Sequence, residues 1–154
     1  MQRKLCLIAF LLAGFGAWTP AVAVDGLVTK PSKYSVAESM DRLDGAIKEG
    51  GGTVFARIDL KAAAQKGELL RPHQIIIFGR GGALQPFLTA ASTTGIDLPQ
   101  KILVFEDSEG KVWVTYNAAE YVAQRHGISS VGGIAEVVAG INRTVSSFAG
   151  KVVQ

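Results

Sequence analysis

Apolar side chains recur at helical spacing early in the chain, between residues 35 and 50. The repeat runs four, three and four residues, which places its members on one face of a helix. Ser35 and Glu38 form a capping box in front of this stripe, and the glycines at 50–52 follow it, so both ends carry a local signal. The apolar members are Val36, Met40, Leu43 and Ile47.

A second, longer stripe predicts a helix over about 131–149. Its apolar positions fall on one face, with Glu136, Asn142 and Arg143 on the other. A stripe of this length is expected to pack on a sheet or on a second subunit, and we favour the sheet of the same chain. The apolar members are Val131, Ile134, Val138, Ile141, Val145 and Phe148.

Short runs rich in β-branched and apolar residues predict five strands. The last two are joined by Asp107 to Gly110, a connection typical of a β-hairpin. Three further short helices are predicted, with Pro86 in the first turn of the second. The strands are expected at 27–29, 53–58, 74–78, 101–106 and 111–116, the short helices at 62–66, 83–91 and 118–126, and a loop at 92–99.

Direct strand-to-strand connections favour an antiparallel or mixed sheet, and each long helix has a single apolar face. These two features together predict an α+β fold, a mostly antiparallel sheet with helices packed on one face. The length of 154 residues suits one such domain, which we expect to cover residues 24–154.

The first 23 residues are typical of a bacterial secretory signal peptide. Arg3 and Lys4 precede an uncharged, mostly apolar run, and 21–23 reads Ala-Val-Ala, a pattern that signal peptidase accepts. We therefore expect cleavage after Ala23, a periplasmic or secreted protein, and no membrane association after cleavage. An uncleaved anchor helix is the alternative.

Cleavage changes the charge and the cysteine content. The full chain has 16 basic and 13 acidic residues and a net charge of +3; loss of Arg3 and Lys4 leaves 14 basic residues and a net charge of +1. This balance, without runs of like charge, argues against a nucleic-acid partner. Cys6 is the single cysteine and leaves too, which excludes disulfides and thiolate metal sites. We expect no cofactor.

A glycine-rich turn, Gly79-Arg80-Gly81-Gly82, follows a predicted strand and precedes a predicted helix. In this context glycine amides can cradle an anion, and Arg80 can add a bidentate contact. Leu84 stands where a third glycine of a dinucleotide-binding pattern would fall. A plain flexible turn is therefore the alternative to a site for a small anionic ligand.

Two histidines, His73 and His126, are the remaining candidates for chemistry. Either one paired with a carboxylate such as Asp59 could act as a base or a metal ligand. A purely structural role is the alternative, since no spacing typical of a metal site surrounds them. Glu106 and Asp107 are adjacent carboxylates that are expected to point to opposite faces of a strand, and we interpret Asp107 and Glu109 as turn residues.

Blocks of residues along the chain resemble the domain of unknown function 302 family over about 34–128. The resemblance implies a small α+β domain similar to the TATA-binding-protein fold, often dimeric, without an established activity and without DNA binding. Because the resemblance ends near residue 128, the predicted helix at about 131–149 is expected to be an addition to the family-like core. The blocks are 41–43, 54–59, 70–72, 76–79, 97–99, 101–107, 110–117 and 125–127.

Asp59, Arg71 and His126 match the family pattern. Leu60 stands where the family usually has histidine, His73 where it has threonine, and Arg80-Gly81 where it has asparagine-proline. These departures imply that any polar site of the family is altered in this chain.

The leading hypothesis is an exported, non-enzymatic domain that binds a small ligand or assembles with itself as a homodimer. The alternatives are a hydrolase or lyase that uses His126 or His73 with Asp59, and a protein that binds a metal or haem through the histidines. The candidate ligand-binding residues are Asp59, Arg71, His73, Arg80, Gly81 and His126.

Overall fold

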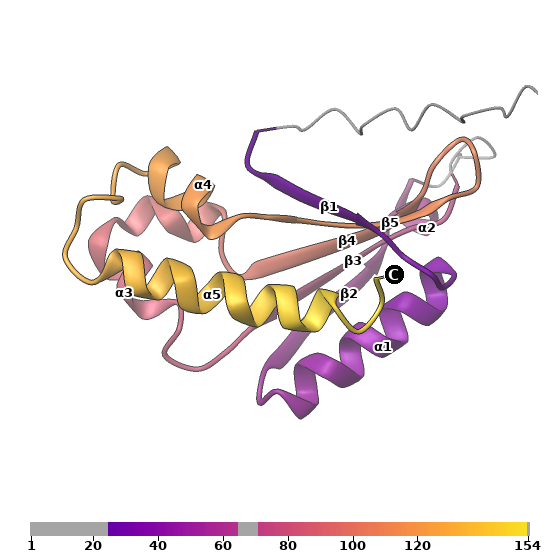
Figure 1. Cartoon of the computed structure of the whole chain (residues 1–154), viewed down its shortest axis with the longest axis horizontal. Coiled ribbons are helices and arrows are strands. Elements are labelled where there is room, and N and C mark those ends of the chain that lie inside the picture. The colour runs from indigo at the N-terminus through magenta and orange to yellow at the C-terminus, as the bar shows by residue number, and fades with distance from the viewer. Residues whose placement is uncertain (1–24, 65–70, 154) are drawn as a thin grey trace, which may run out of the picture.

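The computed structural model describes residues 25–64 and 71–153, so the predicted signal peptide and positions 65–66 of a predicted helix lie outside the described residues. A five-stranded sheet in the order β1-β5-β4-β3-β2 forms the centre of the fold, with every neighbouring pair antiparallel (Figure 1). This confirms the predicted α+β class. The strands are β1 (Leu27–Pro31), β2 (Thr53–Asp59), β3 (His73–Gly79), β4 (Gln100–Glu106) and β5 (Val112–Asn117).

The helices largely follow the predicted segments. A 3₁₀ helix, η1 (Ser92–Ile96), lies where we expected a loop, because Thr94 is buried and its hydroxyl donates to the Ala91 carbonyl at 2.8 Å. The second helix starts earlier than predicted, since Asp59 caps it. The helices are α1 (Val36–Glu49), α2 (Leu60–Ala63), α3 (Gln85–Ala90), α4 (Ala119–Arg125) and α5 (Ile134–Ala149).

The N-terminus of α1 uses half of the predicted capping box. The Ser35 hydroxyl accepts from the backbone amide of Glu38 at 3.2 Å, which satisfies one of the free amides of the first turn. The Glu38 carboxylate does not reach back; it pairs with Arg42 one turn later, at 3.0 Å. Gly50 ends the helix, where its amide donates to the Ala46 carbonyl.

The helix α5 begins at Ile134, three residues later than the stripe alone predicts. Gly133 in front of it has a φ of 81°, a left-handed conformation that glycine adopts without strain. Val131 therefore lies outside the helix and is 43% exposed, which corrects its assignment to the apolar stripe. The other five members, from Ile134 to Phe148, are buried.

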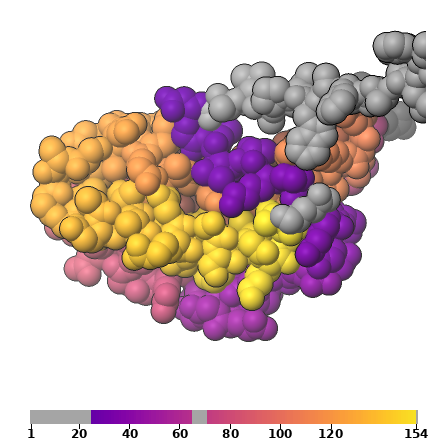
Figure 2. Space-filling view, viewed as in Figure 1, coloured from indigo at the N-terminus to yellow at the C-terminus, as the bar shows by residue number. Residues whose placement is uncertain are grey.

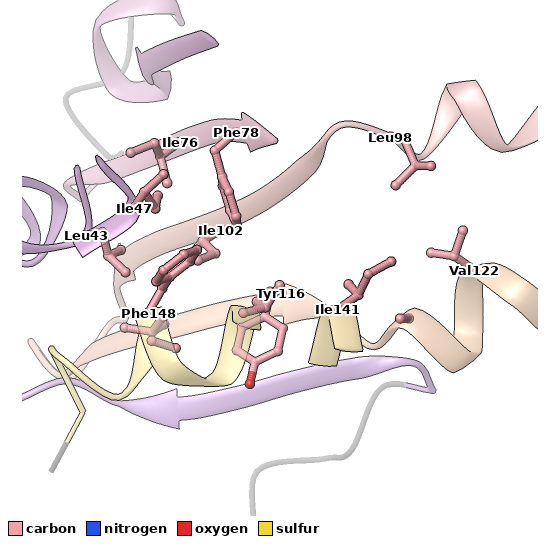
Figure 3. Packing of buried hydrophobic residues seen from close by; sticks show 14 of the residues in the cluster. Leu43, Ile47, Ile76, Phe78, Leu98, Ile102, Tyr116, Val122, Ile141 and Phe148 are labelled. Carbon is pink, nitrogen blue, oxygen red and sulfur yellow. The ribbon is translucent and has the colours of Figure 1, made fainter. Parts of the chain in front are cut away.

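One face of the sheet and the apolar stripes of α1 and α5 form the core. Alternate side chains of a strand share a face, and Ile76, Ile102 and Val104 are fully buried on the helical side. Phe148 of α5 meets Phe78 of β3 edge-to-face, with ring centroids 5.7 Å apart. Figure 3 shows Ile76, Phe78, Ile102 and Phe148 gathered between the strands and the helices. The stripe of α5 is thus covered by its own chain.

The opposite face of the sheet carries apolar side chains that neither long helix covers. Phe55 and Ile58 of β2 are 57% and 38% exposed, and register places Ile58 opposite Ile75. Ile75 in turn lies opposite Leu103 of β4. We call this surface the open sheet face. Among the described residues, no helix is both long and apolar enough to cross a membrane.

Candidate functional site

The six candidate residues lie in three separate parts of the fold. Asp59 and His73 stand at one end of the β2–β3 pair, where Asp59 is in register with Gln74. Arg80 follows the other end of β3. The seven residues of that strand separate the two positions by about 20 Å. His126 lies at the end of α4. The structure therefore does not bring the candidates into one pocket.

At the first position, each candidate side chain already has a local partner. Asp59 accepts from the amide of Ala62 at 3.0 Å and caps α2. The Arg71 guanidinium donates to Glu106 at 2.8 Å and to the Ser108 carbonyl at 3.0 Å, which ties the start of β3 to the β4–β5 turn. These contacts assign both residues a structural role.

His73 is held by its own strand and by the neighbouring one. Its Nδ1 lies 2.8 Å from the Arg71 carbonyl oxygen, and its ring stacks on Phe105 with centroids 5.5 Å apart. The ring belongs to the open sheet face, since His73 and Phe105 are in register. No carboxylate contact with His73 is found among the described residues, so the expected pairing with Asp59 is not present.

His126 pairs with Asp97 rather than with Asp59. Its Nε2 lies 2.7 Å from Asp97 Oδ2, and its Nδ1 lies 2.9 Å from the Thr93 hydroxyl. The His126 and Asp97 side chains are 7% and 11% exposed. Arg125 donates to the second Asp97 oxygen at 3.1 Å. The contacts fasten the end of α4 to both ends of η1.

A hydroxyl, an imidazole and a carboxylate in this order can also relay a proton. The hollows along α5 are lined by residues other than Thr93, Asp97 and His126, so none of these hollows serves the arrangement as a substrate pocket. Within 25–64 and 71–153, no group of three or more His, Cys, Asp or Glu side chains could hold a metal ion.

Asp107 acts as a turn residue between β4 and β5. Asp107 accepts from the Trp113 indole at 2.6 Å and from the amides of Glu109 and Lys111 at 2.9 Å each. The indole hydrogen bond and then the Lys111 amide hold the pKa of Asp107 below its usual value of 3.8, because both stabilise the ionised form. Glu106 points to Arg71 instead.

Arg80 and Gly81 lie at a hollow of about 500 Å³ between the glycine-rich turn and α5. We call it the α5 pocket. Gly79 is the buried last residue of β3, and Arg80, Gly81 and Gly82 after it are exposed. The opposite wall belongs to α5. The apolar lining of the whole pocket comprises Phe78, Ala83, Leu84, Pro86, Val137, Ile141, Val145 and Phe148.

Polar groups are few in the α5 pocket. Of the described residues that line it, only Arg80 is charged. Gln100 adds a carboxamide, and the Thr144 hydroxyl donates to the Gly140 carbonyl within α5 at 3.0 Å. Arg80 makes no ion pair within the two described segments. An anionic group would therefore find a free guanidinium at one end of an apolar hollow.

The α5 wall of this pocket and the partners of His126 were not predicted from the sequence. The signal for the wall was Gly140, a glycine inside a helix, where alanine is favoured by about 1 kcal/mol. A Cβ built on Gly140 would meet only the Arg143 guanidinium, at 4.0 Å. Packing therefore does not require glycine here. Asp97 carried a weaker signal as part of the 97–99 block.

A comparison with known families finds one that matches residues 28–148 and is described as "Domain of unknown function DUF302". The match runs past the 34–128 blocks and includes α5. A solved structure, that of an uncharacterized conserved DUF302 protein from Bacillus stearothermophilus, has a TM-score of 0.71 and 16% identity. It covers 84% of this chain and 99% of that chain, which shows the shared fold.

Among curated proteins, two relatives from Brucella are similar to the chain. The Fluoride-specific ion channel FluC 1 of Brucella suis biovar 1 (strain 1330) is 41% identical over 127 residues, 80% of this chain and 50% of that protein. FluC 2 of Brucella melitensis biotype 1 is 41% identical over 127 residues, 80% of this chain and 47% of that protein. The chain thus spans about half the length of these relatives.

Proposed function

The chain belongs to the DUF302 family, and from that premise we propose that it is an exported domain that binds a small ligand in the α5 pocket. The ligand has an apolar body and one anionic group. The observation that carries the proposal is Arg80, the one charged residue among the described pocket lining. Apolar walls with a few convergent polar groups are typical of small-molecule sites.

The contacts of the other candidates favour binding over catalysis. Asp59 caps a helix, Arg71 joins two turns, and His126 fastens α4 to η1. Each side chain has a structural partner, and none of them lines the α5 pocket. A hydrolase or lyase would need a base and a binding pocket close together. Export to the periplasm or beyond stays part of the proposal, supported by the N-terminal pattern.

Binding of 1-anilinonaphthalene-8-sulfonate, a fluorescent apolar anion, tests the proposal. The native protein should enhance the fluorescence of this dye with saturation. Arg80→Ala should weaken binding by roughly 10-fold, the range of a hydrogen bond to a charged group. Gly140→Leu should weaken binding, because the added side chain would occupy pocket space that Gly140 leaves open.

The matched controls are Lys61→Ala and Gly45→Leu. Lys61 lies on α2, beyond the far end of β3, and its loss changes the net charge by the same amount as loss of Arg80. Gly45 is an interior glycine of α1, and a Cβ added there would meet nothing within 4 Å. Both controls should bind the dye like the native protein. Equal binding by the native protein and Gly140→Leu would contradict the proposal.

Self-assembly is a second candidate function, favoured by the open sheet face. A monomer rarely exposes a contiguous apolar patch of several hundred Å² without a partner. Phe55, Ile58, Ile75 and Leu103 give this face an apolar character, and an apolar surface can pair with the same surface of a second copy. Light scattering across a dilution series measures the resulting mass.

The Brucella relatives suggest a membrane partner. They are fluoride channels in which a region similar to this chain makes up about half of the protein. We propose that this chain associates with a fluoride channel from the exported side. Co-expression with such a channel should change fluoride efflux from cells, and the two should co-purify. Unchanged efflux together with separate purification would refute the association.

A further inference from the structure

The α5 pocket continues into a second hollow of about 560 Å³ over the junction of α3 and α5. The two hollows share Pro86 and Val137 in their walls. We call the combined depression the α5 groove. Figure 2 shows the pink α3 region adjoining the yellow α5 along one side of that helix. The groove therefore follows α5 and does not end at the pocket near Arg80.

The groove is long. Its α5 wall extends from Ile134 to Phe148, a separation of 14 residues that corresponds to about 21 Å along the helix axis. A compact ligand would fill only part of this length. An extended ligand would contact the whole wall.

Arg80 is the one charged side chain among the described residues that line the groove. Arg80, the exposed glycines of the turn and Gln100 line the α5 pocket, the part of the groove that includes Phe148. The middle, around Pro86 and Val137, is apolar. At the far end, Gln85 and Thr89 are exposed, beside Val131 and Ile134. A ligand that matches this distribution has a single charged head and an apolar body without internal polar groups.

We infer that the α5 groove binds an unbranched acyl chain that ends in a carboxylate or a phosphate. The anionic head contacts Arg80, and the chain extends along α5 toward Val137. This inference rests on the proposed ligand-binding function and names the class of ligand. The one hydroxyl that α5 contributes to the pocket lining, that of Thr144, is bonded to the Gly140 carbonyl, so the α5 wall presents apolar surface to the body of the ligand.

Gly140 supports an extended ligand. It lies in the wall between Val137 and Ile141, and its missing side chain leaves the floor of the groove open along the helix. Leucine there would divide the groove into two parts. Chain atoms near Arg80 would still bind, and those beyond position 140 would lose their contacts.

A series of alkanoates, from hexanoate through octanoate and decanoate to dodecanoate, tests the inference below the concentrations at which they form micelles. Each methylene buried in an apolar site is expected to raise affinity about fourfold. Arg80→Ala should lower the affinity of every member by the same factor and leave the slope unchanged. Methyl decanoate, which lacks the charge, should bind the native protein and Arg80→Ala equally.

Gly140→Leu provides the second measurement. Its affinity should stop rising with chain length beyond the shortest members, whereas Gly45→Leu should keep the native slope. Dodecyl phosphate compared with dodecanoate shows which anionic head is preferred, and binding of either one with the native slope supports the inference. Circular dichroism and thermal melting confirm that each variant is folded.

Two results would overturn the inference in distinguishable ways. Pocket-dependent binding of the anilinonaphthalene dye, combined with equal affinity for all alkanoates, would refute the acyl chain and leave the proposed function standing. Dye and alkanoate binding that Gly140→Leu and Arg80→Ala both leave unchanged would refute the groove as the site, and the proposed function with it.

Discussion

Ile141→Ala tests the packing of α5 on the sheet, on which both the core and the pocket depend. Ile141 is 7% exposed, and its helix packs against α1, α3 and α4 within one chain. The substitution removes three carbon atoms from a buried position without adding a polar group. Its effect on the free energy of unfolding therefore reports how much the apolar stripe contributes.

The expected loss is about 2–3 kcal/mol. Three buried carbons at about 0.8 kcal/mol each give about 2.4 kcal/mol, and a closed cavity would add to this. Ile141 also lines the α5 pocket, so the vacated space joins an existing hollow and the cavity contribution is small. Ile47, fully buried between α1 and the sheet, has no such outlet, and Ile47→Ala should cost about 3–5 kcal/mol.

Urea unfolding followed by far-ultraviolet circular dichroism measures both variants, at two well-separated protein concentrations. For a domain of this size, the Ile141→Ala loss corresponds to a fall in melting temperature of roughly 10 °C. The fall should be the same at both concentrations, because the stripe is covered within the chain. A concentration-dependent loss would place the stripe in a dimer interface, and no loss would show that α5 does not pack as described.

Three further outcomes are expected. The pKa of Asp107 is lowered in the folded protein, so its carboxylate stabilises the fold above pH 3.8 and loses this effect as the pH falls through the lower, folded value. The difference in unfolding free energy between the native protein and Asp107→Asn should therefore be smaller in acid. Urea titrations at neutral pH and at about pH 2 measure this difference. Phe55→Lys, on the open sheet face, should lower the mass measured by light scattering if that face self-associates, and an unchanged dimer would exclude it. Sequencing of exported protein should begin at Val24, and an intact Met1 would refute cleavage.

The fold was predictable because its signals are local. Ser35 and the glycines at 50–52 set the ends of α1, and the hairpin turn before β5 carries its own glycine. The start of α5 was placed too early because Val131 continues the apolar period of the helix. The glycine pair at 132–133 interrupts the backbone there, with φ at 81° for Gly133. The spacing of apolar residues alone does not reveal that interruption.

The site was only partly predictable because it depends on contacts between distant segments. The turn that holds Arg80 was identified from its glycines alone. The pocket needs α5 as a second wall, which follows about 60 residues later in the chain and could not be placed from spacing. His126 and Asp97 are 29 residues apart. The choice of Asp59 as partner had only residue type behind it.

Some of the glycines that line the α5 pocket are required by the fold, and others are not. A Cβ on Gly52 or Gly79 would approach a neighbouring side chain to 2.8 or 2.9 Å, and Gly82 has a φ of 78°, so the fold itself explains these three. Gly81 and Gly140 face no such restriction, and alanine at Gly140 would favour the helix. Both line the hollow, Gly81 from the glycine-rich turn and Gly140 from α5. Because neither position has a side chain, the hollow stays open. The stability of the fold does not require an open hollow, whereas the proposed ligand binding does.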